Sequence, residues 1–358
     1  MIRKADVPVR PIGGFFGLAI DDVPSTPASV WQEWVRHFGA VATFGTGRAA
    51  LAALIKAVAP RRVWLPAYYC PEATSAVSAA AIKIAAEVLT YALVDELDPD
   101  IASLSTQLVT EDLVVVVDYF GWPPSQAFRD WARNKPEVIW VEDRAQALWT
   151  AAPPWASWCI FSPRKLLGVP DGGMLLGAVL PISNAASYRS ADPTIVLPEL
   201  MRLEDREERY NDRWYAAYRE REHGFIHNSG PMSRLTEALL QRIPIEPLVS
   251  ARQNNYRYLL DRLPALVAWP RAADSVAPFG LPIAVEDSQS LARQLASERL
   301  FCARHWPRIA ADPALFSYEH GLSRQLLTLP CDHRYAPEQL ARLADTIKRL
   351  APSPGCIR

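Results

Sequence analysis

Cysteine is scarce in this chain of 358 residues, which has only five: Cys70, Cys159, Cys302, Cys331 and Cys356. Their number is odd and their spacing is not that of metal ligands, so a disulfide scaffold is not expected. We expect no metal site, and the cysteines fit the reducing cytoplasm better than an oxidising compartment.

Net charge and long apolar runs are also lacking. The formal net charge of -1 argues against nucleic acid or an anionic membrane as the main partner. No apolar run reaches the length of a membrane span, and the N-terminal segment has no apolar signal-peptide core. We therefore expect a cytoplasmic protein with no membrane partner. The one charge-dense stretch, residues 202–223, has mixed signs typical of a solvated helix or a subunit contact.

Hydrophobic residues make up half of the chain, and the length suggests about two domains. Short apolar runs typical of strands alternate with helical patterns; these runs are residues 63–66, 113–118, 138–143, 158–161 and 173–180. Leu51, Leu54, Ile55 and Val58 share one helical face. Apolar strands that alternate with helices predict an α/β domain with a largely parallel sheet buried on both faces.

The first domain is expected to span residues 1–245. A helix over 247–263 would then lead into a smaller α+β domain that ends at 358. We expect strands at 281–286 and 325–330 in this second domain, and a closing helix over 336–350.

The stretch TFGTGRAALAAL contains a possible phosphate-binding turn. Thr46 can cap a helix that starts near Arg48, and Gly47 would let a ligand approach the backbone closely. A helix N-terminus offers free N–H groups and a positive dipole, which suit a phosphate group. The alternative interpretation is an ordinary capped helix after a glycine turn.

The stretch VEDRAQ follows a predicted strand and carries its acidic residues at the carboxyl end, where ligands bind in open α/β sheets. A carboxylate there could keep the ring nitrogen of pyridoxal phosphate (PLP) protonated, so that the ring accepts electrons from a carbanion. We prefer Asp143 for this role because Glu142 would point to the opposite face, and Gln146 could bond the ring's phenolic oxygen. Alternatively, Asp143 only caps the next turn.

Lys165 lies in the stretch SPRKLLGVPDGG, where Pro163 and Pro170 restrict the backbone on both sides. A lysine that bonds a fixed aldehyde carbon benefits from such a stiff loop. Ser162 offers a hydroxyl for a phosphate, and Arg164 could lower the pKa of the lysine or hold an anion. The alternative is an ordinary surface lysine.

The ordered set of motifs resembles the DegT/StrS-type sugar aminotransferases, which are fold-type I PLP enzymes, and indicates a divergent branch of them. The resemblance is carried by TGRAAL at 46–51, DYFGWP at 118–123, EDRAQA at 142–147, SPRKLLGVPDGG at 162–173 and HNSGPMSRLTEALL at 227–240. It covers residues 12–348, including the linker helix and the last strand.

The resemblance implies a fold-type I large domain and the PLP cofactor, with Lys165 as its covalent attachment and as the general base and acid. It implies an amino-acid donor, glutamate, and a keto group on a nucleotide-linked sugar as acceptor. Asn228 would contact the phosphate of the neighbouring subunit's cofactor, which implies a homodimer with shared active sites. Members that dehydrate sugars have histidine in place of the lysine, so Lys165 argues against dehydration.

Three positions depart from the pattern of the family. Ser162 lies closer to the lysine than the phosphate-binding serine of the family, and Arg48 stands where many members have a small polar residue. Cys70 falls where an aromatic residue stacks on the cofactor ring, and Tyr69 could replace that residue only after a one-residue shift. These departures leave open a PLP-fold scaffold that binds a ligand or partner without turnover.

Overall fold

The structure is a computed structural model that describes residues 12–13, 28–182, 192–205, 209–225 and 230–351. Its strands are β1 (Ile12–Gly13), β2 (Ala40–Phe44), β3 (Arg62–Pro66), β4 (Glu87–Tyr91), β5 (Leu113–Val117), β6 (Ile139–Asp143), β7 (Trp158–Phe161), β8 (Gly173–Gly177), β9 (Gly280–Ala284), β10 (Leu300–Phe301) and β11 (Leu326–Pro330).

Its α-helices are α1 (Val30–Phe38), α2 (Gly47–Val58), α3 (Pro71–Ile84), α4 (Ile101–Gln107), α5 (Gln126–Arg133), α6 (Leu197–Glu204), α7 (Asn211–Gly224), α8 (Arg234–Leu240), α9 (Ile245–Arg262), α10 (Ser288–Ser297), α11 (Ser317–Gln325) and α12 (Pro337–Leu350).

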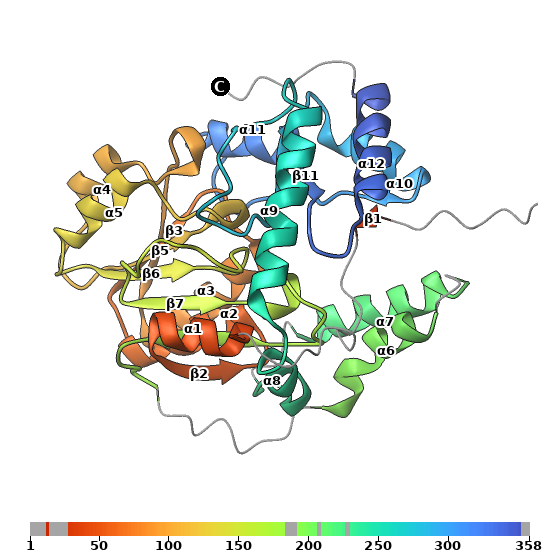
Figure 1. Ribbon diagram of the computed structural model, residues 1–358. Helices are drawn as coiled ribbons and strands as arrows, with labels where there is room; N and C mark the ends of the chain where they lie inside the picture. Colours follow the sequence, from red (N-terminus) through yellow and green to blue (C-terminus); the bar gives the residue numbers. More distant parts are fainter. Residues whose placement is uncertain (1–11, 14–27, 183–191, 206–208, 226–229, 352–358) are drawn as a thin grey trace, which may run out of the picture.

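A seven-stranded sheet forms the centre of the molecule in the order β2-β8-β7-β6-β5-β3-β4. Only β8 runs antiparallel to its neighbours in this sheet; the other pairs are parallel. Helices flank the sheet (Figure 1). The predicted α/β class with a mainly parallel sheet is therefore confirmed.

Successive strands are added to opposite sides of β3, so the order of the strands in the sheet reverses at this point. The strand β4 lies outside β3, and the chain then crosses back to place β5 on the other side of β3. Ligands bind at such switch points, beyond the carboxyl ends of the strands. The carboxyl ends of β3, β5, β6 and β7 lie at one edge of the sheet, where the loops that follow them converge.

Alternate residues of β7 and β8 point into two separate apolar layers. Ile160 and Leu175 belong to the layer beneath α2 and α3, whereas Phe161, Met174 and Leu176 belong to the layer beneath α1, α8 and α9. This alternation is the two-residue period of a strand covered on both faces.

The C-terminal part contains the antiparallel pair β9 and β11 together with α10, α11 and α12. The helix α9 runs from the large sheet to these elements (Figure 1) and contacts β9 and α12. The proposed boundary at residue 245 stays a prediction. None of the helices among the described residues is long and apolar enough to cross a membrane.

The stretch 202–223 was expected to be one helix, and this is wrong. Helix α6 ends at Glu204 and α7 begins at Asn211. The carboxylate of Asp205 accepts hydrogen bonds from the backbone N–H groups of Arg209 and Tyr210 at 2.8 and 2.9 Å.

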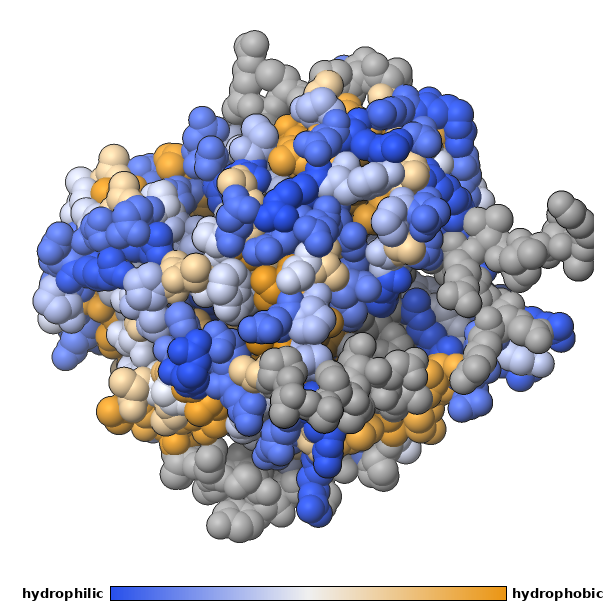
Figure 2. Space-filling model, viewed as in Figure 1, coloured by the Kyte–Doolittle hydropathy of each residue, from blue (hydrophilic) through white to orange (hydrophobic). Residues whose placement is uncertain are grey.

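Helices α6 and α7 project from the body of the molecule as an arm (Figure 1). Figure 2 shows an apolar patch at the lower right, where α6 lies in Figure 1. Leu197, Leu200 and Met201 are exposed on this helix. The arm thus leaves apolar side chains uncovered in the single chain.

Candidate active site

A cavity of about 980 Å³ opens at the edge of the sheet where the strand ends converge. Every predicted site residue lines it except Asn228, which lies outside the described residues. The predicted residues that line the cavity are Thr46, Gly47, Arg48, Tyr69, Cys70, Asp143, Gln146, Ser162 and Lys165. The structure thus brings together side chains from segments about 120 residues apart in the sequence, while their roles stay predictions.

The N-terminus of α2 forms one wall of the cavity. Thr46 caps the helix, and its Oγ1 accepts a hydrogen bond from the backbone N–H of Ala49 at 3.2 Å. Gly47 is the first helical residue, and a Cβ atom there would lie 3.3 Å from the carbonyl oxygen of Phe161. The predicted cap is present, and the close approach at Gly47 is to the backbone of Phe161, while the approach of a ligand to this helix end stays a prediction.

Arg48 places a cation beside this helix end. Its Nε and Nη2 atoms are buried, and they have no hydrogen-bond partner within the part of the chain that the structure describes. Burial, followed by the nearby charge of Arg164, lowers the pKa of Arg48. Buried guanidinium nitrogens without a partner are costly unless an anion accepts their hydrogen bonds. Arg48 therefore fits a site that accepts a phosphate or carboxylate.

Residues 162–173, which contain Lys165, form the lysine loop. The two glycines that end this loop, Gly172 and Gly173, pack against the turn at Thr46. The N–H of Gly172 donates to the carbonyl of Gly45 at 2.8 Å. Gly172 has φ +116°, which favours glycine, and a Cβ atom at Gly173 would lie 2.1 Å from the carbonyl carbon of Thr46. The DGG sequence therefore lets two backbone segments touch, and this contact holds the lysine loop beside the turn.

Asp143 ends β6 and is buried at the cavity wall. Its Oδ1 accepts the backbone N–H of Ala145 at 2.9 Å, and its Oδ2 accepts the phenol O–H of Tyr69 at 2.6 Å. The carboxylate thus caps the next turn and also lines the cavity, so the two interpretations of Asp143 are compatible. Gln146 Oε1 accepts the backbone N–H of Phe120 at 2.8 Å.

Glu142 does not line the cavity and faces a buried charge cluster instead. Its Oε1 lies 3.3 Å from Nη1 of Arg144, which also lies 3.3 Å from Oδ2 of Asp118. The thiol of Cys159 donates to Oε2 of Glu142 at 3.3 Å. This arrangement agrees with the choice of Asp143 over Glu142, because successive strand residues point to opposite faces.

Tyr69 and Cys70 both line the cavity, but neither is free of other contacts. The thiol of Cys70 donates to Oε2 of Glu72 at 3.1 Å, and the Tyr69 hydroxyl is bound to Asp143. Neither partner could be predicted from the sequence. Glu72 is typical of an acidic residue in the first turn of a helix, here α3, and Asp143 lies 74 residues from Tyr69.

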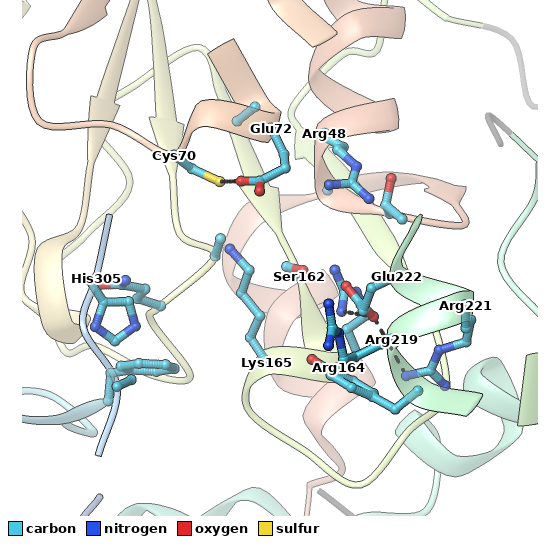
Figure 3. Close-up of a pocket in the computed structure, with 18 of the residues that line it drawn as sticks. Arg48, Cys70, Glu72, Ser162, Arg164, Lys165, Arg219, Arg221, Glu222 and His305 are labelled. Carbon is cyan, nitrogen blue, oxygen red and sulfur yellow. Dashed lines mark hydrogen bonds and ion pairs between the residues drawn. The ribbon is translucent and has the colours of Figure 1, made fainter. Parts of the chain in front are cut away.

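Lys165 closes a short 3₁₀ turn, Pro163–Lys165, and its backbone N–H donates to the carbonyl of Ser162 at 3.0 Å. Its side chain is half-buried and points toward Cys70 and Glu72 in Figure 3. The interpretation of Lys165 as an ordinary surface residue is therefore wrong, because the stiff turn aims the amino group into the cavity.

Two further walls of the cavity come from parts of the chain that were not among the predicted site residues. The arm contributes side chains of α7 such as Tyr218 and Glu222, and the C-terminal part contributes His305 and Trp306. Burial, followed by the charge of Lys165, lowers the pKa of His305 to about 3. Among the described residues, no group of three or more side chains is arranged to hold a metal ion.

No protein-family model and no curated protein sequence matches the chain. Solved structures do share its fold. A DegT DnrJ EryC1 StrS aminotransferase from Brucella abortus is 15% identical, with a TM-score of 0.63, over 90% of this chain and 89% of that chain. The sugar aminotransferase CalS13 from Micromonospora echinospora is 16% identical, with a TM-score of 0.62, over 95% and 100%.

Spr1654 from Streptococcus pneumoniae, solved in a PLP form, is 14% identical, with a TM-score of 0.64, over 95% of this chain and 98% of that chain. At these identities the likeness establishes the fold. The fold that the motifs predicted, that of the DegT/StrS-type aminotransferases, is therefore confirmed.

Proposed function

We propose that the protein is a PLP-dependent aminotransferase. It would move an amino group from an amino acid, expected to be glutamate, to a keto group of a nucleotide-linked sugar. The observation that carries this proposal is that Lys165 and Asp143, from different strand ends, line one cavity together with the capped N-terminus of α2. The fold shared with proteins described as sugar aminotransferases supports the same class of reaction.

The residues of the cavity fit PLP by their chemistry. The N-terminal N–H groups of α2 and the Nε and Nη2 atoms of Arg48 suit its phosphate, with Ser162 as a further donor. Asp143 suits the ring nitrogen, and the amide of Gln146 suits the phenolic oxygen. When bound, PLP supplies an electron sink for the carbanion formed from an amino acid.

Lys165 performs the proton transfer in this proposal. Its Nζ would hold the cofactor, and as a free amine it would take a proton from the α-carbon of the amino acid and deliver it to the reactive carbon of the cofactor. The stiff turn at Pro163–Lys165 limits the positions of this amine. The buried ring of Tyr69 and the half-buried ring of His305 line the same cavity.

A homodimer in the cytoplasm completes the proposal, with a place in polysaccharide or glycan synthesis. Asn228 would reach the partner's cofactor phosphate, and it follows α7 closely in the sequence. The exposed apolar side chains of α6, Leu197, Leu200 and Met201, support a contact with a second copy, because isolated surfaces of this kind are usually covered.

The test of the proposal is cofactor loading followed by a half-reaction. Purified protein mixed with PLP should develop a visible absorption band that disappears on borohydride reduction, and mass spectrometry should find the label on Lys165. Adding glutamate should convert the band to the pyridoxamine form. Lys165→Ala should take no covalent label and lose the half-reaction.

Absence of the band would contradict the proposal and favour a binding scaffold. Loading without conversion by any amino donor would contradict transamination alone. A Lys165→Ala variant that still transfers the amino group would contradict the role of the lysine.

A further inference from the structure

Tyr69 donates its phenol proton to the carboxylate that the proposed function assigns to the cofactor ring. The hydroxyl lies 2.6 Å from Oδ2 of Asp143, and both side chains are buried. Burial, followed by the charge of Asp143, raises the pKa of Tyr69 well above its usual range. The phenol therefore stays protonated and acts as a donor rather than as a second anion.

This bond and one backbone bond together fix the plane of the carboxylate. The backbone N–H of Ala145 occupies Oδ1 of Asp143, and Tyr69 occupies Oδ2. Each carboxylate oxygen can accept two hydrogen bonds, so each keeps one acceptor position. Asp143 can thus be held by the protein on both oxygens and still accept a proton donor from a ligand.

The ring of Tyr69 is itself held by the C-terminal part of the chain. Trp306 lies edge-on to it, with ring centroids 6.2 Å apart, and also packs against Tyr68 and Tyr119 at 5.0 and 5.9 Å. Trp306 has φ +52°, a conformation that bulky residues rarely adopt. An unusual backbone conformation therefore places this indole against Tyr69, and it connects the C-terminal part to Asp143.

We propose that Tyr69 is a positioning residue that orients the carboxylate of Asp143 toward the cofactor ring, instead of stacking on that ring. The inference rests on the proposed function for the identity of the ligand, whereas the orientation of Asp143 can be tested without it. It assigns Tyr69 a polar role where the sequence suggested only a stacking one.

The test compares Tyr69→Phe with a matched control, Tyr91→Phe. Tyr91 is also buried and donates its phenol proton, to the carbonyl of Val115 at 2.7 Å, but it does not line the cavity. Both variants lose one buried phenol hydrogen bond from the same sheet region. Only Tyr69→Phe should affect Asp143.

Tyr69→Phe should slow the glutamate half-reaction about tenfold, because a hydrogen bond to a charged group is lost and the carboxylate can rotate. The KM for the donor should stay unchanged, and the visible circular dichroism of the bound cofactor should change. Tyr91→Phe should leave the rate and the dichroism within about twofold of the wild type. Equal effects of the two variants, or no effect of Tyr69→Phe, would overturn the inference.

A second readout does not depend on the cofactor. Crystal structures of both variants without added PLP should show Asp143 rotated in Tyr69→Phe and unmoved in Tyr91→Phe. An unmoved Asp143 in Tyr69→Phe would overturn the positioning role even if the protein transaminates. Rotation of Asp143 in a protein that never binds PLP would leave the positioning role intact and contradict the proposed function instead.

Discussion

Arg164, the neighbour of Lys165 in the chain, forms an ion pair with Glu222 of α7, with Nη1 and Oε1 2.7 Å apart. The pair attaches the arm to the lysine loop, and Figure 3 shows it at the edge of the cavity. Both Arg164 and Arg221 also lie over the ring of Phe225, at 5.1 and 5.6 Å from its centroid. No residue of α7 is buried, so charged and ring contacts hold this helix in place of an apolar core.

Glu222→Gln should therefore loosen α7. We expect the backbone amides of α7 to exchange with deuterium about fivefold faster, which corresponds to a loss of about 1 kcal/mol for a partly exposed pair. Hydrogen–deuterium exchange with mass spectrometry measures this. Glu220→Gln removes the same charge from an exposed position of the same helix and should leave the exchange unchanged. Equal exchange in the two variants would mean that the ion pair does not hold the arm.

Arg48→Ala should weaken the binding of PLP about tenfold or more, because charge-assisted hydrogen bonds to the phosphate are lost. Pyridoxal, which has no phosphate, is the matched ligand, and its binding should change little. Titration followed by absorption measures both affinities. If Arg48→Ala weakened PLP and pyridoxal equally, Arg48 would not be the residue that contacts the phosphate.

Gly173→Ala should destabilise the protein, because the added Cβ would lie 2.1 Å from the backbone of Thr46. We expect the free energy of unfolding to fall by about 1–3 kcal/mol or more. Gly321 lies in α11 with nothing within 4 Å of a Cβ atom, so Gly321→Ala should raise the stability by about 0.5–1 kcal/mol. Urea denaturation of both variants checks the opposite signs, and a stable Gly173→Ala would refute the close contact.

His305 should make the stability fall in acid. Its pKa is lowered by burial, and then by the charge of Lys165, from 6.5 to about 3. Between these values the unfolded chain binds a proton that the folded chain does not. The free energy of unfolding therefore decreases as the pH falls through this window, by up to about 1.4 kcal/mol for each pH unit.

His305→Gln should reduce this slope between pH 6.5 and about 3, measured by urea denaturation at several pH values. Part of the slope should remain, because burial also lowers the pKa of His333 to about 4. His223 is exposed, and His223→Gln should follow the wild-type curve. A His305→Gln curve parallel to the wild type would contradict the burial of a neutral His305.

Local patterns in the sequence predicted the elements that frame the cavity. Thr46 at the start of α2, the apolar run before Asp143 and the proline-bounded turn at Lys165 all depend on neighbours within a few residues. Capping, the alternation of strand residues and the restricted backbone of proline act over that range. They can therefore be predicted from the sequence of each segment alone. The resemblance to aminotransferases was built on these same local segments.

The break between α6 and α7 was missed, although the bonds of Asp205 are also local. A charged residue in a charged stretch is equally compatible with a continued helix, so Asp205 gave no distinct signal of a helix end. Propensity is weak in such stretches, and tertiary contacts decide the outcome.

The sequence by itself determined the inner strands of the sheet, the capped turn, the strand-end carboxylate and the lysine loop, because each follows from short-range steric and hydrogen-bonding preferences, whereas the edge strands β2 and β4 were not predicted. Only the tertiary structure decided that Tyr69 binds Asp143 and that Trp306 packs against Tyr69, 237 residues further along the chain. Such pairs form when the strand ends and the C-terminal part are packed together. Their partners are set by the shape of the whole core rather than by any neighbouring residues.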